Sequence, residues 1–238
     1  MKIIKSRCSK LISSCLMVVT LAAASMVSAQ DNSLTPQQEA DGWQLLFNGK
    51  DMSQWRNFKK PDLNSKWIVE NGEMKLTDGG GGDILTKKKY DNFDLRLEWQ
   101  ISKAGNSGIF VMADEEGSAI YSHAVEVQIL DNELHSDNKE TDHLAGSLYD
   151  MVASPLDSHR PAGQWNQVRI LLNNKLLRVW QNNVMVTNVL IGGIQWDKLV
   201  ANSKFSSWSG FAQASIGHIG LQDHSDPVAF KNIKIKEL

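Results

Sequence analysis

The chain has 238 residues, of which 42% are hydrophobic and 22% are charged, and its formal net charge at pH 7 is −2. Residues 1–29 contain four basic residues and no acidic one, so the remaining 21 basic and 27 acidic residues give the rest of the chain a net charge of −6. An acidic chain of this kind is poorly suited to nucleic acid or to an anionic membrane surface, because both carry negative charge themselves.

Residues 1–29 have the pattern of a secretory signal peptide. A basic start, MKIIKSRCSK, precedes an apolar stretch that ends in Val27-Ser28-Ala29, and we predict cleavage after Ala29. Ile12-Ser13-Ser14-Cys15 has the residue types of a lipobox, but the apolar stretch follows Cys15 instead of preceding it, so a lipoprotein is the less favoured alternative. No other segment reaches the ~20 apolar residues of a membrane-spanning helix. We therefore predict a periplasmic or secreted protein without a transmembrane anchor.

Cysteine usage agrees with export and limits what can stabilise the fold. Cys8 and Cys15 both lie in the predicted signal peptide, so the mature chain has no disulfide and no thiolate metal site. Residues 30–41 are polar and predict a loose leader. Residues 42–238 have a length that suits one all-β domain, and we expect a monomer.

From Gly42 onward, short alternating runs are separated by turn signals, which predicts many β-strands. Hairpin turns are expected at Asn71-Gly72, Asn173-Asn174 and Asn182-Asn183. The expected strands lie in WQLLFNG, KWIVENGEMKL, FDLRLEWQIS, SGIFVMA, AVEVQIL, WNQVRILLNNKLLRVWQNNVMVTNVLI, HIGLQDH and VAFKNIKIKEL.

These runs together favour a sandwich of two antiparallel sheets. The meander between Trp165 and Ile191 is typical of concanavalin-like and laminin-G-like jelly rolls, in which a concave sheet can hold sugar on its polar face. Residues 195–207 predict one short helix, and the glycines at 79–82 predict a flexible loop. The predicted fold class is an all-β, concanavalin-like jelly roll.

The strand HAVEVQILD, residues 123–131, presents two different faces. Val125, Val127 and Ile129 occupy one phase of a period-two alternation, whereas Glu126 and Gln128 occupy the other. Asp131 is out of phase with them unless a bulge adds a residue. A solvated sheet face is the simpler interpretation of an isolated strand of this kind. The segment that follows it favours the floor of a site instead.

That segment, residues 131–150, is a long loop rich in side chains that can ligate metals. Long loops in compact domains are usually functional or disordered. His135 with Asp137, or Asp142 with His143, could bind a divalent ion through nitrogen and oxygen, although the spacing matches no specific metal motif. A possible divalent metal ion is therefore the one cofactor expectation, and its identity stays open.

Further candidates lie elsewhere in the chain. His224 can act as an acid or base, since imidazole titrates near neutrality without perturbation, but Asp223 and Asp226 could equally form a turn-capping network there. Asn106-Ser107-Gly108 is interpreted as a turn whose side chains could touch a substrate. Among the eight tryptophans, those in loop-like contexts are the better candidates for stacking on a sugar ring, namely Trp55, Trp196 and Trp208.

An ordered set of fragments resembles the bacterial 3-keto-disaccharide hydrolase family of secreted proteins. The match runs from Gly42 to Leu238, and the fragments are GWQLLFNGKDMSQWR, NSGIFV, EVQILDNELHSD, AGSLYD, PAGQWNQVRI and HIGLQDHSDPVAFKNIKIKEL. One departure is His123-Ala124 before Glu126, where family members often carry a more polar or proline-bearing stretch. The resemblance implies a concanavalin-like sandwich that acts on glycosides oxidised at C3.

Such a substrate implies a particular chemistry. A 3-ketone acidifies the C2 proton, a base removes it, the leaving group departs from C1, and water adds to the resulting enone. This route needs a base, a group that stabilises the enolate and a proton donor. Gln128, a histidine or a divalent ion could stabilise the enolate. The catalytic candidates are Glu126, His135 and His224, and the substrate-binding candidates are Asn106, Ser107, Gln128, Asp131, His143, Tyr149, Gln222 and Trp55.

Two alternatives remain from the sequence. A retaining β-glucanase would use Glu126 and Asp131, but a regular strand places their Cα atoms about 16 Å apart, far from the ~5 Å carboxylate separation of a retaining pair. A non-catalytic carbohydrate-binding module needs only a jelly roll with exposed tryptophans. That second alternative leaves the loop rich in histidine and acidic residues unexplained.

Overall fold

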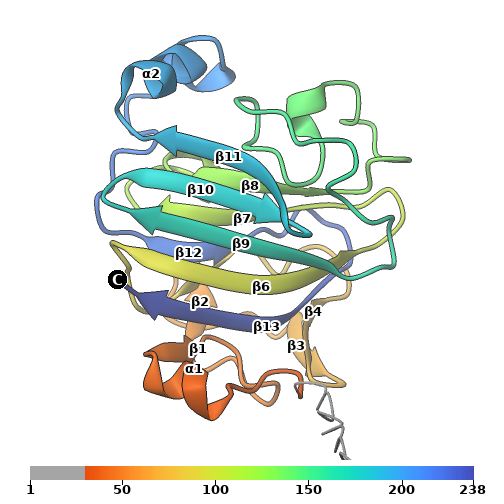
Figure 1. Ribbon diagram of the computed structural model, residues 1–238. Coiled ribbons are helices and arrows are strands. Elements are labelled where there is room, and N and C mark those ends of the chain that lie inside the picture. The colour runs from red at the N-terminus through yellow and green to blue at the C-terminus, as the bar shows by residue number, and fades with distance from the viewer. Residues whose placement is uncertain (1–29) are drawn as a thin grey trace, which may run out of the picture.

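The computed structural model describes residues 30–238 and shows two antiparallel β-sheets packed face to face (Figure 1). The predicted all-β sandwich is therefore confirmed. The predicted signal peptide lies outside the described residues. Within residues 30–238, no helix is long and apolar enough to cross a membrane.

The larger sheet, sheet A, has eight strands. Its β13 pairs with β6 along one side, while the other side pairs first with β4 and then with β1. In spatial order the strands are β11 (Val184–Leu190), β10 (Leu176–Gln181), β9 (Asn166–Asn173), β6 (Phe93–Ile101), β13 (Val228–Glu237), β4 (Glu73–Leu76) and β3 (Trp67–Glu70), with β1 (Trp43–Leu45) beside β13.

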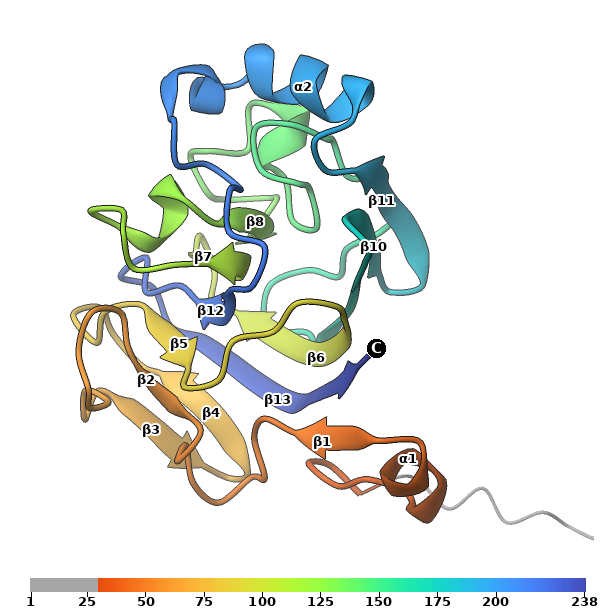
Figure 2. The same ribbon diagram turned by 90° about the vertical axis from the view of Figure 1, so that its left-hand side faces the viewer.

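The smaller sheet, sheet B, has five strands and carries the strand of interest at its edge. An end-on view separates the two layers, with β7, β8 and β12 facing β6 and β10 (Figure 2). The order is β2 (Trp55–Asn57), β5 (Ile84–Thr86), β12 (His218–Leu221), β7 (Asn106–Ala113) and β8 (Val125–Leu130).

The core lies between the sheets and follows the period-two alternation of the strands. In β6, Phe93, Leu95, Leu97, Trp99 and Ile101 all belong to the central cluster of buried side chains, and the residues between them face outward. From the opposite sheet, Val125, Val127 and Ile129 of β8 join the same cluster, as their phase predicts. Burial of these side chains supplies the main stabilisation of the sandwich.

The hairpin turns follow from residues that tolerate positive φ. Asn71-Gly72 has φ values of 54° and 77°, and Asn182-Asn183 has 47° and 68°, which fits the type I′ turns predicted there. The third turn is one residue later than predicted, because Asn174 and Lys175 adopt the positive φ values and Asn173 ends β9.

Two segments predicted to be loose are held in place. In the predicted leader, Thr35 caps the short helix α1 (Pro36–Ala40) in a capping box with Gln38. Asn32 donates its backbone N–H to Asn232 Oδ1 at 2.6 Å and accepts from the Asn232 N–H at 2.8 Å. In the glycine loop, the backbone N–H groups of Gly80 and Gly82 both donate to Asp223 Oδ2. The backbone N–H groups of both segments thus donate to side chains that lie far away in the sequence, and these hydrogen bonds order the two segments.

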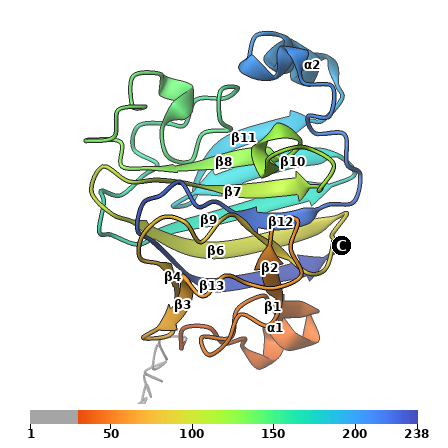
Figure 3. The same cartoon turned by 180° about the vertical axis from the view of Figure 1, so that it is seen from behind.

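The helix predicted at 195–207 is confirmed as two pieces. Helix α2 spans Ile194–Ala201 and the 3₁₀ turn η3 spans Lys204–Ser207. Shorter 3₁₀ turns lie at Ile120–Ser122 (η1) and Thr141–His143 (η2). Seen from behind, α2 and the long loop after β8 both lie beyond the β8 edge of sheet B (Figure 3). This edge carries the candidate site.

Candidate active site

The polar face of the β7–β8 pair forms the floor of a pocket of about 470 Å³. Glu126 and Gln128 of β8 and Asn106 of β7 line this floor, on the side of sheet B that faces away from the core. Seven of the side chains proposed from the sequence lie in this pocket together with Tyr121, Asp137 and Lys204, the seven being Asn106, Glu126, Gln128, His135, Tyr149, Gln222 and His224.

The long loop after β8 builds the wall of the pocket by returning to the edge of sheet B. Gly146 donates its backbone N–H to Gln128 O at 2.8 Å, and Tyr149 donates its backbone N–H to Glu126 O at 3.1 Å. Val127 also forms a bridge with Leu148. The exposed edge of β8 is thus covered by its own chain, and Tyr149 is brought beside Glu126.

Glycine at position 108 makes room for the Glu126 carboxylate. Gly108 is the cross-strand partner of Gln128, and a Cβ placed on it would lie 2.3 Å from Glu126 Oε1. Any larger side chain there would therefore displace the carboxylate. This requirement explains the glycine in Asn106-Ser107-Gly108, which begins strand β7 and is not the turn predicted from the sequence.

Glu126 is a buried carboxyl with an unusual proton affinity. Burial raises its pKa to about 8, the nearby Lys204 opposes this shift, and Asp83 and Asp137 add to it. Within residues 30–238 its carboxylate makes no hydrogen bond or ion pair with a protein group. Perturbed carboxyls of this kind in a pocket are typical of acid–base catalysts.

Asp137 is fixed in the wall of the pocket by two partners. It accepts a hydrogen bond from the Tyr149 hydroxyl at 3.0 Å and contacts His143 Nδ1 at 2.9 Å. Burial alone would lower the pKa of His143, but its hydrogen bonds with Asp137 and Asp150 outweigh that effect and raise it. The His143 ring also stacks on Tyr149, with centroids 4.4 Å apart. The wall of the pocket is therefore pre-organised.

Lys204 and Tyr121 complete the mouth of the pocket. Lys204 comes from η3, where its backbone N–H donates to Asp150 Oδ2 and its Nζ lies 4.1 Å from the centre of the Tyr149 ring. Tyr121 is 45% exposed and packs on Trp208. Sequence reasoning missed both residues, because neither lies near a recognisable motif and only the fold brings them to Glu126.

Several polar atoms in the pocket lack a partner. Asn106 Oδ1 and Gln222 Oε1 are buried and make no hydrogen bond within the described chain. Gln128 Oε1 accepts from the Ile129 N–H at 3.1 Å, which leaves the Gln128 amide N–H groups for the pocket. Buried polar atoms usually have partners, so these atoms are suited to a polar ligand.

His135, His224 and Asp226 form a cluster whose donor atoms lie within 4.8 Å of one another. Two imidazoles and a carboxylate are a donor set that first-row divalent metals accept. The Asp137 N–H donates to His135 Nδ1 at 3.0 Å, so Nε2 is the nitrogen free to bind an ion. Ion binding there would move the ring proton to Nδ1 and lose that hydrogen bond.

Four predicted substrate contacts do not line the pocket. Asp131 is 2% exposed and accepts the backbone N–H groups of Ala104 and Glu133, so it caps the start of the loop without a bulge in β8. Ser107 is fully buried and donates to Gln222 O, which places it beneath the site. His143 lies behind Tyr149.

The fourth is Trp55, which is a core residue and not a sugar platform. It is 1% exposed, and its indole N–H donates to Leu46 O at 2.7 Å. Trp196 is also buried, at 5% exposure. Trp208, the third tryptophan suggested for stacking, is half-buried at the rim beside Tyr121. The sequence around each tryptophan resembles a loop in all three cases, and it could not show which indole rings are buried and which are exposed.

Comparison with known proteins decides the family. Residues 42–236 match the family model described as "3-keto-alpha-glucoside-1,2-lyase-like domain". The chain belongs to this family. It is 35% identical to the 3-keto-disaccharide hydrolase of Bacteroides thetaiotaomicron over 90% of this chain and 84% of the relative. The family and the prediction of a glycoside-cleaving enzyme are thereby confirmed.

Solved structures agree with the fold. A protein of Parabacteroides distasonis, assigned by its name to the glycosyl hydrolases, is 30% identical and superposes with a TM-score of 0.82 over 88% of this chain and 100% of its own. A Bacillus subtilis protein with a galectin-like fold is 9% identical, with a TM-score of 0.51 over 87% of this chain and 94% of its own. The latter likeness shows the fold alone.

Titration of Glu126 should be visible in the stability of the protein. Its pKa is raised from 4.5 to about 8, so folding favours the protonated form. This stabilisation is complete below pH 4.5 and is lost as the pH rises toward about 8. The variant Glu126→Gln cannot ionise at this position and serves as the reference. Compared with it, the melting temperature of the wild type should fall by several degrees across that pH window and should fall no further at higher pH. Thermal unfolding from pH 4 to 9 measures the difference, and a constant difference would contradict the raised pKa.

Proposed function

We propose that the enzyme cleaves the glycosidic bond of 3-keto-glycosides, such as 3-keto-disaccharides, by elimination followed by hydration. The observation that carries this proposal is Glu126, a buried carboxyl without a charged partner at the floor of a polar pocket, with a pKa of about 8. Family membership supports the same substrate class. An exported location remains the prediction made from residues 1–29.

In the first step, the Glu126 carboxylate takes the proton from C2 of the 3-keto sugar. The electron pair of the C–H bond moves toward the ketone and forms an enolate on the C3 oxygen. A carboxylate with a pKa of about 8 is a much stronger base than an ordinary glutamate, which lowers the barrier to removing a carbon-bound proton. Burial of Glu126 thus has a direct chemical use.

In the second step the enolate collapses, the C1–O1 bond breaks, and the leaving group takes a proton as a C1=C2 enone forms. Water then adds its oxygen to C1, and a proton returns to C2. The Gln128 amide N–H groups, left free by the bond from Ile129, would stabilise the enolate oxygen. His224, with 49% of its side chain exposed at the mouth, is placed to protonate the departing oxygen.

A conventional retaining glycosidase reaction does not suit this pocket. That reaction needs a second carboxylate ~5 Å from the first. Asp131, the partner considered from the sequence, is bound to backbone N–H groups outside the pocket. Asp137 lines the pocket, but its oxygens are occupied by His143 and Tyr149. A single base with hydrogen-bond donors around it favours elimination.

A divalent cation is the second part of the proposal. His135, His224 and Asp226 fit such an ion by donor type and spacing, and three protein ligands would leave positions open to substrate oxygens. When bound, the ion would supply Lewis-acid polarisation of a carbonyl. Glu126 keeps its role at C2, whereas His224 would serve either as a ligand of the ion or as the proton donor to the departing oxygen, and not as both.

The direct test is activity of Glu126→Gln on 3-keto-trehalose. Wild-type enzyme should release 3-keto-glucose, and the variant should be slower by about 10²- to 10⁴-fold, the usual contribution of a positioned general base. Glu133→Gln is the matched control, because Glu133 is exposed on the adjacent loop, and it should keep full activity. Release from unoxidised trehalose at the same rate, or full activity of Glu126→Gln, would refute the proposal.

The pH profile gives an independent test of the base. As Glu126 must be ionised, kcat/KM should rise with pH and level off above about 8. Lys204 lowers the pKa of Glu126, so Lys204→Gln should move the midpoint to higher pH. A profile that falls through the same range would make Glu126 the acid instead of the base.

The ion can be tested without an activity assay. After incubation with Mn²⁺ or Zn²⁺ and desalting, wild-type protein should retain about one ion per chain by elemental analysis, as three protein ligands lead us to expect. His224→Gln should lose it, while His159→Gln, which removes a partly exposed histidine outside the cluster, should not. Equal ion content in all three proteins would exclude this cluster as the site.

A further inference from the structure

The outer face of sheet A carries a second groove, of about 570 Å³, on the opposite side of the sandwich from the active site. The N-terminal segment from Gln30 to Gln38 forms one wall, and strands β13, β6, β9 and β10 form the floor. Its size is within the range of small-molecule sites. The elimination mechanism uses none of its residues.

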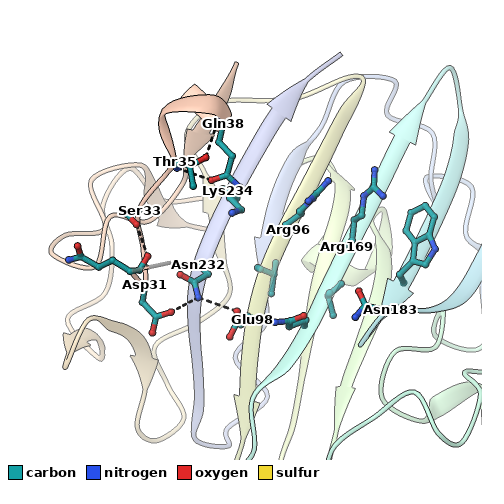
Figure 4. A pocket seen from close by; sticks show the side chains of 15 residues that line it. Asp31, Ser33, Thr35, Gln38, Arg96, Glu98, Arg169, Asn183, Asn232 and Lys234 are labelled. Carbon is teal, nitrogen blue, oxygen red and sulfur yellow. Dashed lines mark hydrogen bonds between the residues drawn. The ribbon is translucent and has the colours of Figure 1, made fainter. Parts of the chain in front are cut away.

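Three cations lie in a row across this floor. Lys234 of β13 is the direct cross-strand partner of Arg96 in β6, and Arg96 is the direct partner of Arg169 in β9. Figure 4 shows the three side chains beside one another across the strands. Like charges placed directly opposite in a sheet are destabilising, and this row stands in a chain that is otherwise acidic.

The neighbouring row on the same face has the arrangement expected for stability. Lys231 is the cross-strand partner of Glu98, with Nζ and Oε2 3.9 Å apart, and Glu98 is opposite the neutral Gln167. Lys231 also pairs with Asp31 at 2.8 Å. Asp31 and Glu98 thus share one lysine, so that end of the groove keeps one net negative charge, whereas the Lys234–Arg96–Arg169 row keeps an excess of positive charge.

The two guanidinium groups of the row are held in fixed positions. Asp94 lies between them, and each of its oxygens accepts from both Arg96 and Arg169 at distances of 2.8 to 3.3 Å. Arg96 also stacks over Trp43 at 4.6 Å, and Arg169 over Trp180 at 4.8 Å. Planar guanidiniums fixed in this way are suited to bind oxyanions with little loss of entropy.

Donor groups of the row remain uncommitted. Each arginine uses Nε and Nη2 on Asp94, which leaves Nη1 without a hydrogen bond to any described residue. Lys234 makes no ion pair or hydrogen bond within residues 30–238. Partial burial, with a contribution from Arg96, lowers the pKa of Lys234. Asp94 is bonded to two of the three cations, so the row with Asp94 keeps a net charge of +2, which a bound anionic group would reduce.

We propose that this groove binds a saccharide that carries a carboxylate or a sulfate group. The anionic group would sit on Arg96, Arg169 and Lys234. The side-chain amides of Gln167 and Asn183 line the same groove and bind no other described residue, so they can meet sugar hydroxyls. This site is separate from the catalytic pocket, and the proposal does not depend on the reaction assigned to Glu126.

The test is binding, measured by calorimetry at low salt, of trigalacturonate, a sulfated chondroitin tetrasaccharide and neutral maltotriose. Wild-type protein should bind at least one anionic probe and bind it more tightly than maltotriose. Added NaCl should weaken that binding through screening. Lys234→Gln should weaken it about tenfold, the loss expected for one charge-assisted hydrogen bond.

Lys175→Gln is the matched control, since it removes an exposed lysine of the β9–β10 turn that does not line the groove, and it should keep the affinity. Binding of trigalacturonate, with or without the chondroitin probe, would assign the groove to carboxylates, which both probes carry, and binding of the chondroitin probe alone would assign it to sulfates. No anionic binding, equal binding of maltotriose, or equal losses in the two variants would overturn the proposal. Lys234→Gln should melt no lower than wild type, because it relieves repulsion in the row.

Discussion

The site depends on a carboxyl group that the fold keeps away from water. Glu126 occupies the outer phase of an edge strand, where an ordinary glutamate would be solvated. The chain after β8 returns, pairs with that edge through Gly146 and Tyr149, and covers it. Burial then raises the pKa of Glu126 to about 8. Because an isolated buried carboxylate is costly, the surrounding structure must be stable enough to impose this environment.

The neighbouring groups are arranged so that they do not neutralise Glu126. Asp137 has its oxygens occupied by Tyr149 and His143, and Lys204 lies over the Tyr149 ring without forming an ion pair with Glu126. An arginine paired with Glu126 would lower its pKa and weaken it as a base. The pocket therefore combines a carboxyl whose pKa is raised to about 8 with unpaired amide groups, an arrangement that suits a polar ligand.

The fold and the floor of the site could be predicted from the sequence because both follow from local alternation. The phase of Glu126 and Gln128 in β8 depends only on the period of a strand. The roles of Lys204 and Tyr121 could not be predicted, as only long-range packing brings η3 and η1 to β8. The same limit explains why Trp55 and Asp131 were wrongly predicted to contact the substrate, because their burial depends on residues that are distant in sequence. Family resemblance, by contrast, supplied the substrate class directly.

A sandwich has two outer faces, and period-two alternation places polar side chains on both. On sheet B loops cover that phase and leave a polar pocket in which Glu126 is buried. On sheet A it stays open to solvent, where charge is more easily tolerated, and there the Lys234–Arg96–Arg169 row is sustained by Asp94 and by stacking on indoles. The two surfaces share one core but differ in solvent access. The covered face therefore suits chemistry at a raised carboxyl pKa, and the proposed recognition of an anionic group would use the open face.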